Sequence, residues 1–239
     1  MPRYLTKSRF KLACECPTKL FYAGKSSYYD ASKDDDFLAM LADGGYQVGA
    51  LAKLRFLSGI EIHGLEHQKA LDDTSALLNA NDQVVLFEPA IRFGNCFIRI
   101  DVLVKDGQNF ELIEVKAKSF NSAKSELVGK NGQPKSDMLP YVLDAAFQTW
   151  VLRSAIPGAR LKTFLMMPDK SKVAEIDGIN QMFKIDSENR DVEVRIPDGV
   201  DGPQIAETWL FVVFIRWTSG LLKQAPGHWH RGTMAYPGC

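Results

Sequence analysis

Two carboxylates and a lysine occur close together in the segment RIDVLVKDGQNFELIEVKAKS, residues 99–119. Asp101 lies in one apolar run, and Glu114 and Lys116 lie in the next. Burying charged side chains is costly unless they are paired or bind a cation. The segment therefore indicates either a site with chemistry or an exposed sheet face that carries ordinary salt bridges.

A predicted β-hairpin joins the two runs, and its turn decides how the carboxylates face each other. If residues 107–108 form a two-residue loop, Asp101 is paired directly with Glu114, with Cβ atoms about 4.5 to 5.5 Å apart. If residues 106–107 form the loop, Asp101 faces Leu112 instead. Glu114 then lies on the diagonal, about 7 to 8 Å away. Both registers keep the two carboxylates on one face of the sheet.

Opposed carboxylates on one sheet face favour a hard divalent cation, because like charges destabilise a sheet and Mg²⁺ and Mn²⁺ prefer oxygen ligands. Lys116 shares this face, where its ammonium can stabilise charge that develops on a phosphate during hydrolysis. The alternative is a solvated face on which Arg99, Asp101, Glu114 and Lys116 form cross-strand salt bridges. Apolar residues are expected on the opposite face: Ile98, Ile100, Val102, Val104, Ile113 and Val115.

The remaining patterns predict an α/β order of elements around this hairpin. Helices are predicted over 6–23 as two short helices that start after Thr6 and at Pro17, and over 41–57, 67–80, 136–155 and 203–223. Strands are predicted over 83–93, 95–104, 109–117 and 160–168. On the helix over 136–155, Gln148 shares a stripe with Tyr141, Asp144 or Ala145, and Leu152. An amide that faces the sheet can hold a phosphate or a water; a partly exposed surface glutamine is the alternative.

The composition is that of one ordinary globular domain over residues 1–239. Lys+Arg and Asp+Glu are equal at 29 each, so contact with nucleic acid would have to rest on a local patch. The most apolar run, residues 209–215, is far shorter than the roughly 20 residues that cross a bilayer. No membrane partner is expected, and the lack of signal-peptide features at the N-terminus predicts a cytoplasmic location. In a cytoplasmic protein the cysteines are expected to be free thiols or metal ligands.

The strand aspartate at 101, the EVK at 114–116 and the glutamine helix LDAAFQTWVL resemble the PD-(D/E)XK nuclease superfamily, in particular its RecB-like exonuclease branch. CPTKLFY, GYQVGALAKLRF, LFEPAIRF and IEVKAKS are similar to a bacterial family of uncharacterised proteins with a RecB-like nuclease domain. The resemblance covers residues 4–170. It implies a restriction-endonuclease-like core, with a mixed central sheet flanked by helices.

The resemblance also implies a function and a set of site residues. The expected activity is metal-dependent hydrolysis of DNA phosphodiester bonds with Mg²⁺ or Mn²⁺, as an exonuclease on ends or single strands in repair or defence. A catalytically inactive nucleic-acid-binding or assembly domain is the alternative. The implied roles are metal ligand for Asp101, Glu114, the Val115 carbonyl and additionally Glu88, catalytic lysine for Lys116, and support of the site for Gln148.

The chain departs from the family at two points. Many RecB-like members carry a metal-binding histidine where this chain has Gly49, and His63 and His67 are expected to be structural or exposed. Several relatives hold a [4Fe–4S] cluster on four cysteines, of which Cys16 and Cys239 resemble two. Either the chain is the N-terminal part of a longer protein that carries the cluster, or no complete cluster forms. Cys14 and Cys96 do not fit the pattern.

A lysine-rich loop follows the hairpin and is a candidate for phosphate contacts with DNA. The alternative is an ordinary solvated loop. Its lysines are Lys118, Lys124, Lys130 and Lys135.

Overall fold

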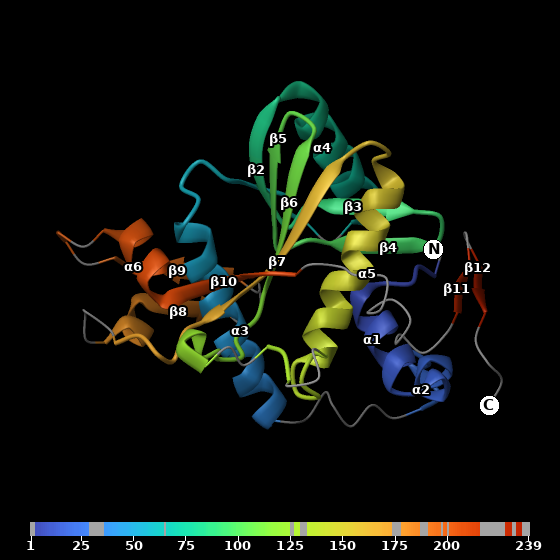
Figure 1. Ribbon diagram of the computed structural model, residues 1–239, viewed down its shortest axis with the longest axis horizontal. Coiled ribbons are helices and arrows are strands. Elements are labelled where there is room, and N and C mark those ends of the chain that lie inside the picture. Colours follow the sequence, from blue (N-terminus) through green and yellow to red (C-terminus); the bar gives the residue numbers. More distant parts are fainter. Residues whose placement is uncertain are drawn as a thin grey trace.

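The computed structural model shows a mixed α/β fold in which helices flank a mixed six-stranded sheet (Figure 1). The strand order is β1-β2-β5-β6-β7-β10. The described residues are 3–28, 36–64, 66–124, 127–129, 133–173, 178–186, 191–196, 198–199, 201–215, 228–230 and 233–235. The expected mixed central sheet with flanking helices is therefore confirmed.

The elements have the following bounds. The helices are α1 (Lys7–Glu15), α2 (Pro17–Tyr22), α3 (Asp36–Leu54), α4 (His67–Ala80), α5 (Leu139–Ala155) and α6 (Gly202–Trp209). The sheet strands are β1 (Ile60–Glu61), β2 (Gln83–Phe87), β5 (Val102–Asp106), β6 (Asn109–Val115), β7 (Arg160–Pro168) and β10 (Leu210–Phe214). Three two-stranded sheets contain β3 (Ala90–Phe93) with β4 (Cys96–Arg99), β8 (Phe183–Asp186) with β9 (Asp191–Val194), and β11 (His228–His230) with β12 (Thr233–Ala235).

Helix starts follow the local signals in the sequence. The Thr6 hydroxyl caps α1 by accepting a hydrogen bond from the Arg9 N–H at 3.4 Å. Pro17 is the first residue of α2, and Pro140 lies in the first turn of α5, where a missing N–H costs nothing. The predicted pair of short helices near the N-terminus and the predicted helix that carries Gln148 are both confirmed.

Both faces of the sheet are covered, so the strands are buried on two sides. On one face, α5, α1 and α4 pack against β2, β5 and β6 through Phe147, Val151, Phe10, Leu78, Leu86, Leu103 and Leu112. On the other face, α3 and α6 pack through Leu51, Ala52, Ile205 and Ala206 against Phe87, Val102, Ile113 and Met166. Figure 1 shows α5 with α1 on one side of β7 and α3 with α6 on the other. α5 forms the crossover between the parallel strands β6 and β7.

The two strands predicted over 83–93 and 95–104 are each broken by a bend. Glu88, with a φ of 54°, and Pro89 separate β2 from β3, and the opposite break at Ile100 and Asp101 separates β4 from β5. β2 pairs with β5 in the large sheet, whereas β3 pairs with β4 in a small one. Pro89 cannot donate to a ladder, which favours the break at this point.

This bend makes the predicted apolar face wrong across the break. Ile98 and Ile100 belong to the core under α5, whereas Val102 and Ile113 belong to the core under α3 and α6. Alternation predicts one face only while a strand is continuous. The bend therefore turns residues of equal parity to opposite sides.

The helix predicted over 203–223 is confirmed only as far as Trp209 and is wrong over 210–214. α6 ends at Trp209, and the apolar run after it forms β10, which pairs antiparallel with β7 from Leu210 opposite Pro168 to Phe214 opposite Phe164. Aromatic and β-branched residues suit a sheet better than a helix. Residues 216–227 lie outside the described part of the chain. Among the helices that are described, none is both long and apolar enough to cross a membrane.

Candidate active site

The turn of the hairpin has the first of the two predicted registers. Asp106 is opposite Asn109, and Val102 is opposite Ile113, so residues 107–108 form the loop. Gly107 has a φ of 58°, a conformation that glycine adopts readily. The same register brings Asp101 opposite Glu114, one step beyond the last ladder pair.

Asp101 lies in the bend before β5. Its side chain replaces the backbone hydrogen bond that would otherwise continue the β5–β6 ladder. Its Oδ2 accepts a hydrogen bond from the Val115 N–H at 2.6 Å. The backbone has turned away here, because the Ile100 N–H donates to the Pro89 carbonyl at 3.1 Å. The N–H and C=O of one strand residue point to the same edge, so the Val115 carbonyl lies on the Asp101 side.

Glu114 is the centre of a buried network, and its side chain is fully buried. Its Oε2 accepts from Gln148 Nε2 at 2.5 Å. Its Oε1 lies 2.6 Å from Lys116 Nζ and 2.8 Å from Lys7 Nζ. Lys116 Nζ also lies 3.0 Å from Asp144 Oδ2. The four residues to which the resemblance gives catalytic roles are thus brought together with two further charged residues.

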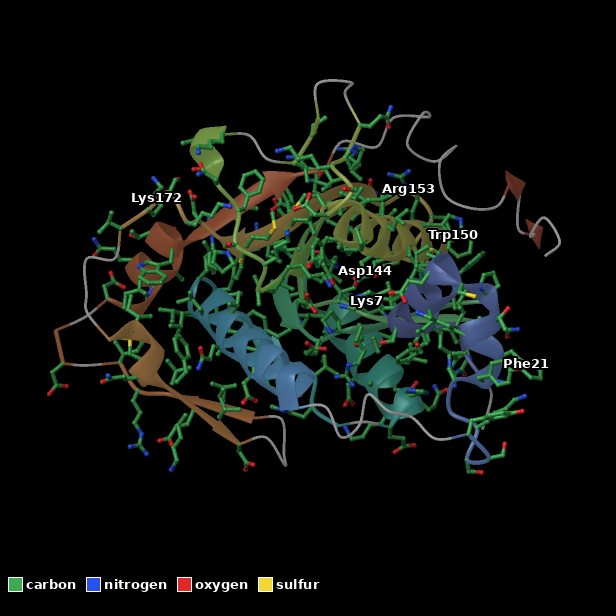
Figure 2. All side chains as sticks on the ribbon, turned by 90° about the horizontal axis from the view of Figure 1, so that it is seen from below. Lys7, Phe21, Asp144, Trp150, Arg153 and Lys172 are labelled. Atoms are coloured by element: carbon green, nitrogen blue, oxygen red, sulfur yellow. The ribbon has the colours of Figure 1, made fainter. Side chains whose placement is uncertain are left out.

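Lys7 is a site residue that the sequence motifs do not indicate. It is the first residue of α1, and its Nζ also lies 3.5 Å from Asp101 Oδ1. Figure 2 labels Lys7 and Asp144, which lie near the centre of that view. One signal was available, because a lysine in the first turn of a helix is at the unfavourable end of the helix dipole.

Burial and charge shift the pKa values of the network in opposite directions. Burial, followed by the neighbouring Glu114, raises the pKa of Asp101 to about 7. Burial would also raise the pKa of Glu114, but Lys7, Lys116 and Gln148 outweigh it and lower the pKa to about 2. Burial would lower the pKa of Lys7, but Asp101 and Glu114 outweigh it and raise the pKa above its usual range. At neutral pH, Glu114 is ionised and both of its lysine partners are charged.

The raised pKa of Asp101 predicts a pH-dependent effect on stability. In the metal-free protein the native state holds a proton at Asp101 that the unfolded chain has released, so stability from this group is lost as pH rises from 3.8 toward about 7. Asp101→Asn removes this loss. The free energy of unfolding of the variant relative to the parent should therefore increase by about 4 kcal/mol between about pH 4 and about pH 8.

Urea denaturation in EDTA at the two pH values measures this difference, and titrating groups that do not interact with Asp101 cancel because both proteins share them. Asp106→Asn, at the exposed far end of β5, the strand that follows Asp101, is the matched control. A stability difference between Asp101→Asn and the parent that does not change with pH would contradict the raised pKa.

The solvated-face alternative is wrong for this site. The exposed fraction of the side chain is 0% for Glu114, 18% for Lys116 and 22% for Asp101. Arg99 is not part of the network; its guanidinium donates to the carbonyls of Glu88, Ile62 and Gly64. The charges therefore belong to a buried cluster beneath α1 and α5.

Glu88 lies beside this cluster. Its N–H donates to the Asp101 carbonyl at 3.3 Å, and its Oε2 lies 3.6 Å from Arg99 Nε. Burial is the main cause that raises its pKa, which Lys7 and Arg99 oppose. The side chain of Glu88 is 41% exposed, so it lies at the rim of the site.

The donor set fits a hard divalent ion by its chemistry. In the described part of the chain, no three His, Cys, Asp or Glu side chains converge where they could hold a metal ion. Asp101 and Glu114 supply two carboxylates, and the Val115 carbonyl adds an oxygen on the same edge. Gln148 Oε1 is buried and has no hydrogen-bond partner among the described residues. A buried acceptor of this kind needs a donor, such as an ordered water.

The other candidates from the sequence lie outside the network. His67 packs its ring 4.3 Å from that of Phe97, and His63 is exposed. Cys14, Cys16 and Cys96 are free thiols, and Cys239 lies outside the described residues. In the lysine-rich loop, Lys118 pairs with Asp137 at 3.0 Å, Lys124 and Lys135 are exposed, and Lys130 lies outside the described residues.

Comparison of the chain with models of known families, with curated proteins and with solved structures found no match. A function for this chain therefore has to be argued from the geometry of the site and from the resemblance of its motifs.

Proposed function

We propose that this protein is a metal-dependent nuclease that hydrolyses phosphodiester bonds of DNA. The observation that carries the proposal is the buried pair Asp101 and Glu114 at the end of β5 and β6, with Lys116 and Gln148 bound to Glu114. The same residues carry the resemblance to PD-(D/E)XK nucleases of the RecB-like branch. The mixed sheet with its β6-α5-β7 crossover is compatible with a restriction-endonuclease-like core, which we include in the proposal.

Asp101, Glu114 and the Val115 carbonyl would hold Mg²⁺ or Mn²⁺. Glu88 lies at the rim and does not converge with the two carboxylates, so its role as an additional ligand rests on the resemblance alone. When bound, such an ion activates water for attack and neutralises charge on the phosphate.

The neighbouring side chains fix the lysine and the carboxylate in place. Asp144 and Glu114 hold Lys116 from two sides, so its ammonium is oriented before substrate arrives. This ammonium stabilises the negative charge that develops on the phosphate as water adds and the P–O bond breaks. Gln148 fixes one oxygen of Glu114 and keeps its own carbonyl oxygen free to accept a hydrogen bond from water.

The proposed substrate is DNA at its ends or in single strands, which follows from the exonuclease branch that the motifs resemble. Lys124 and Lys135, which are exposed beyond β6, are candidate phosphate contacts. Contacts of this kind would give binding that weakens steeply with salt. We place the activity in DNA repair or defence.

A nucleic-acid-binding domain without catalysis is the second candidate, and one observation favours it. The Lys7 and Lys116 ammonium groups already lie against the carboxylates, so the cluster has counter-charges of its own. In that case the carboxylates would not need a metal ion.

Calorimetric titration with Mn²⁺ separates the two candidates. The nuclease proposal expects the parent to bind Mn²⁺ and Asp101→Asn to bind it at least about tenfold more weakly. Asp106→Asn, at the exposed far end of β5, should bind as the parent does. A folded parent that shows no Mn²⁺ binding would favour the binding domain.

A further inference from the structure

The Lys7 ammonium lies between the two carboxylates of the candidate site. Its Nζ is 2.8 Å from Glu114 Oε1 and 3.5 Å from Asp101 Oδ1. The other oxygen of each carboxylate is already used, since Asp101 Oδ2 accepts from the Val115 N–H and Glu114 Oε2 accepts from Gln148. The two oxygens that face Lys7 are therefore the ones without a neutral hydrogen-bond donor, and Glu114 Oε1 also lies 2.6 Å from Lys116 Nζ.

The charge balance argues that Lys7 and a divalent ion exclude each other. With all three carboxylates ionised, as metal binding requires, Asp101, Glu114 and Asp144 carry three negative charges, and Lys7 and Lys116 carry two positive charges. If a divalent ion took the place of the Lys7 ammonium, the ion and Lys116 would balance the three carboxylates. If Lys7 stayed, the buried cluster would carry an excess positive charge, which is costly away from water.

The position of Lys7 on α1 allows its ammonium to leave. Lys7 is the first residue of the helix, and 27% of its side chain is exposed, so its flexible stem can move toward solvent without moving the backbone. The helix itself gives no reason for a cation here, because the N-terminus of a helix favours negative charge. The carboxylates are the partners that hold the ammonium in place.

We infer that Lys7 is a built-in counter-cation that keeps the Asp101 and Glu114 carboxylates together without metal and is displaced when a divalent ion binds between them. This inference rests on the proposed metal-dependent function. It makes Lys7 a positioning residue that competes with the ion and sets the metal affinity of the site.

Mn²⁺ titration of Lys7→Met tests the competition. The variant should bind Mn²⁺ at least about tenfold more tightly than the parent, because the ion no longer has to displace an ammonium. In EDTA, the variant should melt at a lower temperature than the parent, and added Mn²⁺ should raise its melting temperature by more. Lys11→Met, which removes an exposed lysine from the same helix, should change neither quantity.

The outcomes separate this inference from the proposed function. Equal or weaker Mn²⁺ binding by Lys7→Met, with binding by the parent intact, overturns the role of Lys7 and leaves the nuclease proposal standing. Binding by Lys7→Met alone supports the role of Lys7 and counts against a metal-dependent parent. Absence of binding by both folded proteins overturns both proposals.

A second measurement needs no variant and therefore does not depend on Lys7→Met folding. Reductive methylation of the parent, followed by mass spectrometry, reports how accessible the Lys7 amine is with and without Mn²⁺. Methylation of Lys7 should become faster when Mn²⁺ is added, while methylation of Lys11 stays constant. A Lys7 rate that Mn²⁺ leaves unchanged would overturn the displacement.

Discussion

Lys116→Met is expected to slow DNA hydrolysis by about 10²–10³-fold while Mn²⁺ binding persists. Methionine keeps the length of the side chain and removes its ammonium, which Glu114 and Asp144 hold at 2.6 Å and 3.0 Å. The loss should appear in the chemical step, because the ammonium acts on charge that develops only in the transition state. Single-turnover cleavage of labelled DNA at saturating Mn²⁺ measures it.

Lys118→Met is the matched control for this prediction. Lys118 lies two residues further along, on the loop, where it pairs with the exposed Asp137. Its loss should leave the chemical step unchanged and have at most a modest effect on DNA binding. Cleavage by Lys116→Met at the rate of the parent would remove Lys116 from the proposed mechanism.

Glu114→Gln is expected to have the largest effect on stability, a loss of about 3–5 kcal/mol of unfolding free energy at neutral pH. The fully buried carboxylate contacts two ammonium groups through one oxygen, and a neutral amide would remove the counter-charge that they share, leaving Lys116 only Asp144 and Lys7 only Asp101. Because the pKa of Glu114 is lowered to about 2, its contribution is complete above its usual 4.5 and is lost as pH falls toward 2. The penalty should therefore shrink in acid.

Urea denaturation in EDTA measures this effect, with Glu111→Gln as the control on the same strand. Glu111 lies 3.9 Å from Lys162 and is 41% exposed, so its replacement should cost little. Equal stability of the two variants would show that the Glu114 carboxylate does not hold the cluster together. The Glu114→Gln variant should also fail to bind Mn²⁺.

The sequence predicts those parts of the fold and site whose signals are local. Gly107 at the turn predicted a hairpin with two possible registers, and the one that the structure has places Asp101 opposite Glu114. Thr6 and Pro17 predicted two helix starts. The helical spacing in α5 predicted that Gln148 faces the sheet. In each case, the residues that decide the geometry are neighbours along the chain.

The features that the sequence did not predict depend on contacts between distant segments. Lys7 is 94 residues from Asp101 and 107 from Glu114, so no local pattern could bring them together. The apolar run after Trp209 became a strand because β7 offered it an edge for pairing. The composition of the run already favoured a strand, but helical periodicity cannot report the edge with which the run pairs.

The bend between β4 and β5 was missed for a different reason. Pro89 was visible in the sequence as a residue that interrupts a ladder. Its effect on the opposite strand, however, depends on the pairing of the two strands around Asp101. The bend allows the Asp101 carboxylate to accept a hydrogen bond from the Val115 N–H. The irregularity that made the predicted apolar face wrong therefore also positions a site residue.

The most direct test of the central claim is cleavage of DNA by the parent and by an Asp101→Asn, Glu114→Gln double variant. Single- and double-stranded substrates labelled at the 5′ or the 3′ end would be incubated with Mn²⁺, with Mg²⁺ or with EDTA. We expect cleavage by the parent with a divalent ion only, progressing from an end, and none by the double variant. A folded parent that binds Mn²⁺ and leaves every substrate intact would contradict the assignment of this site as a nuclease.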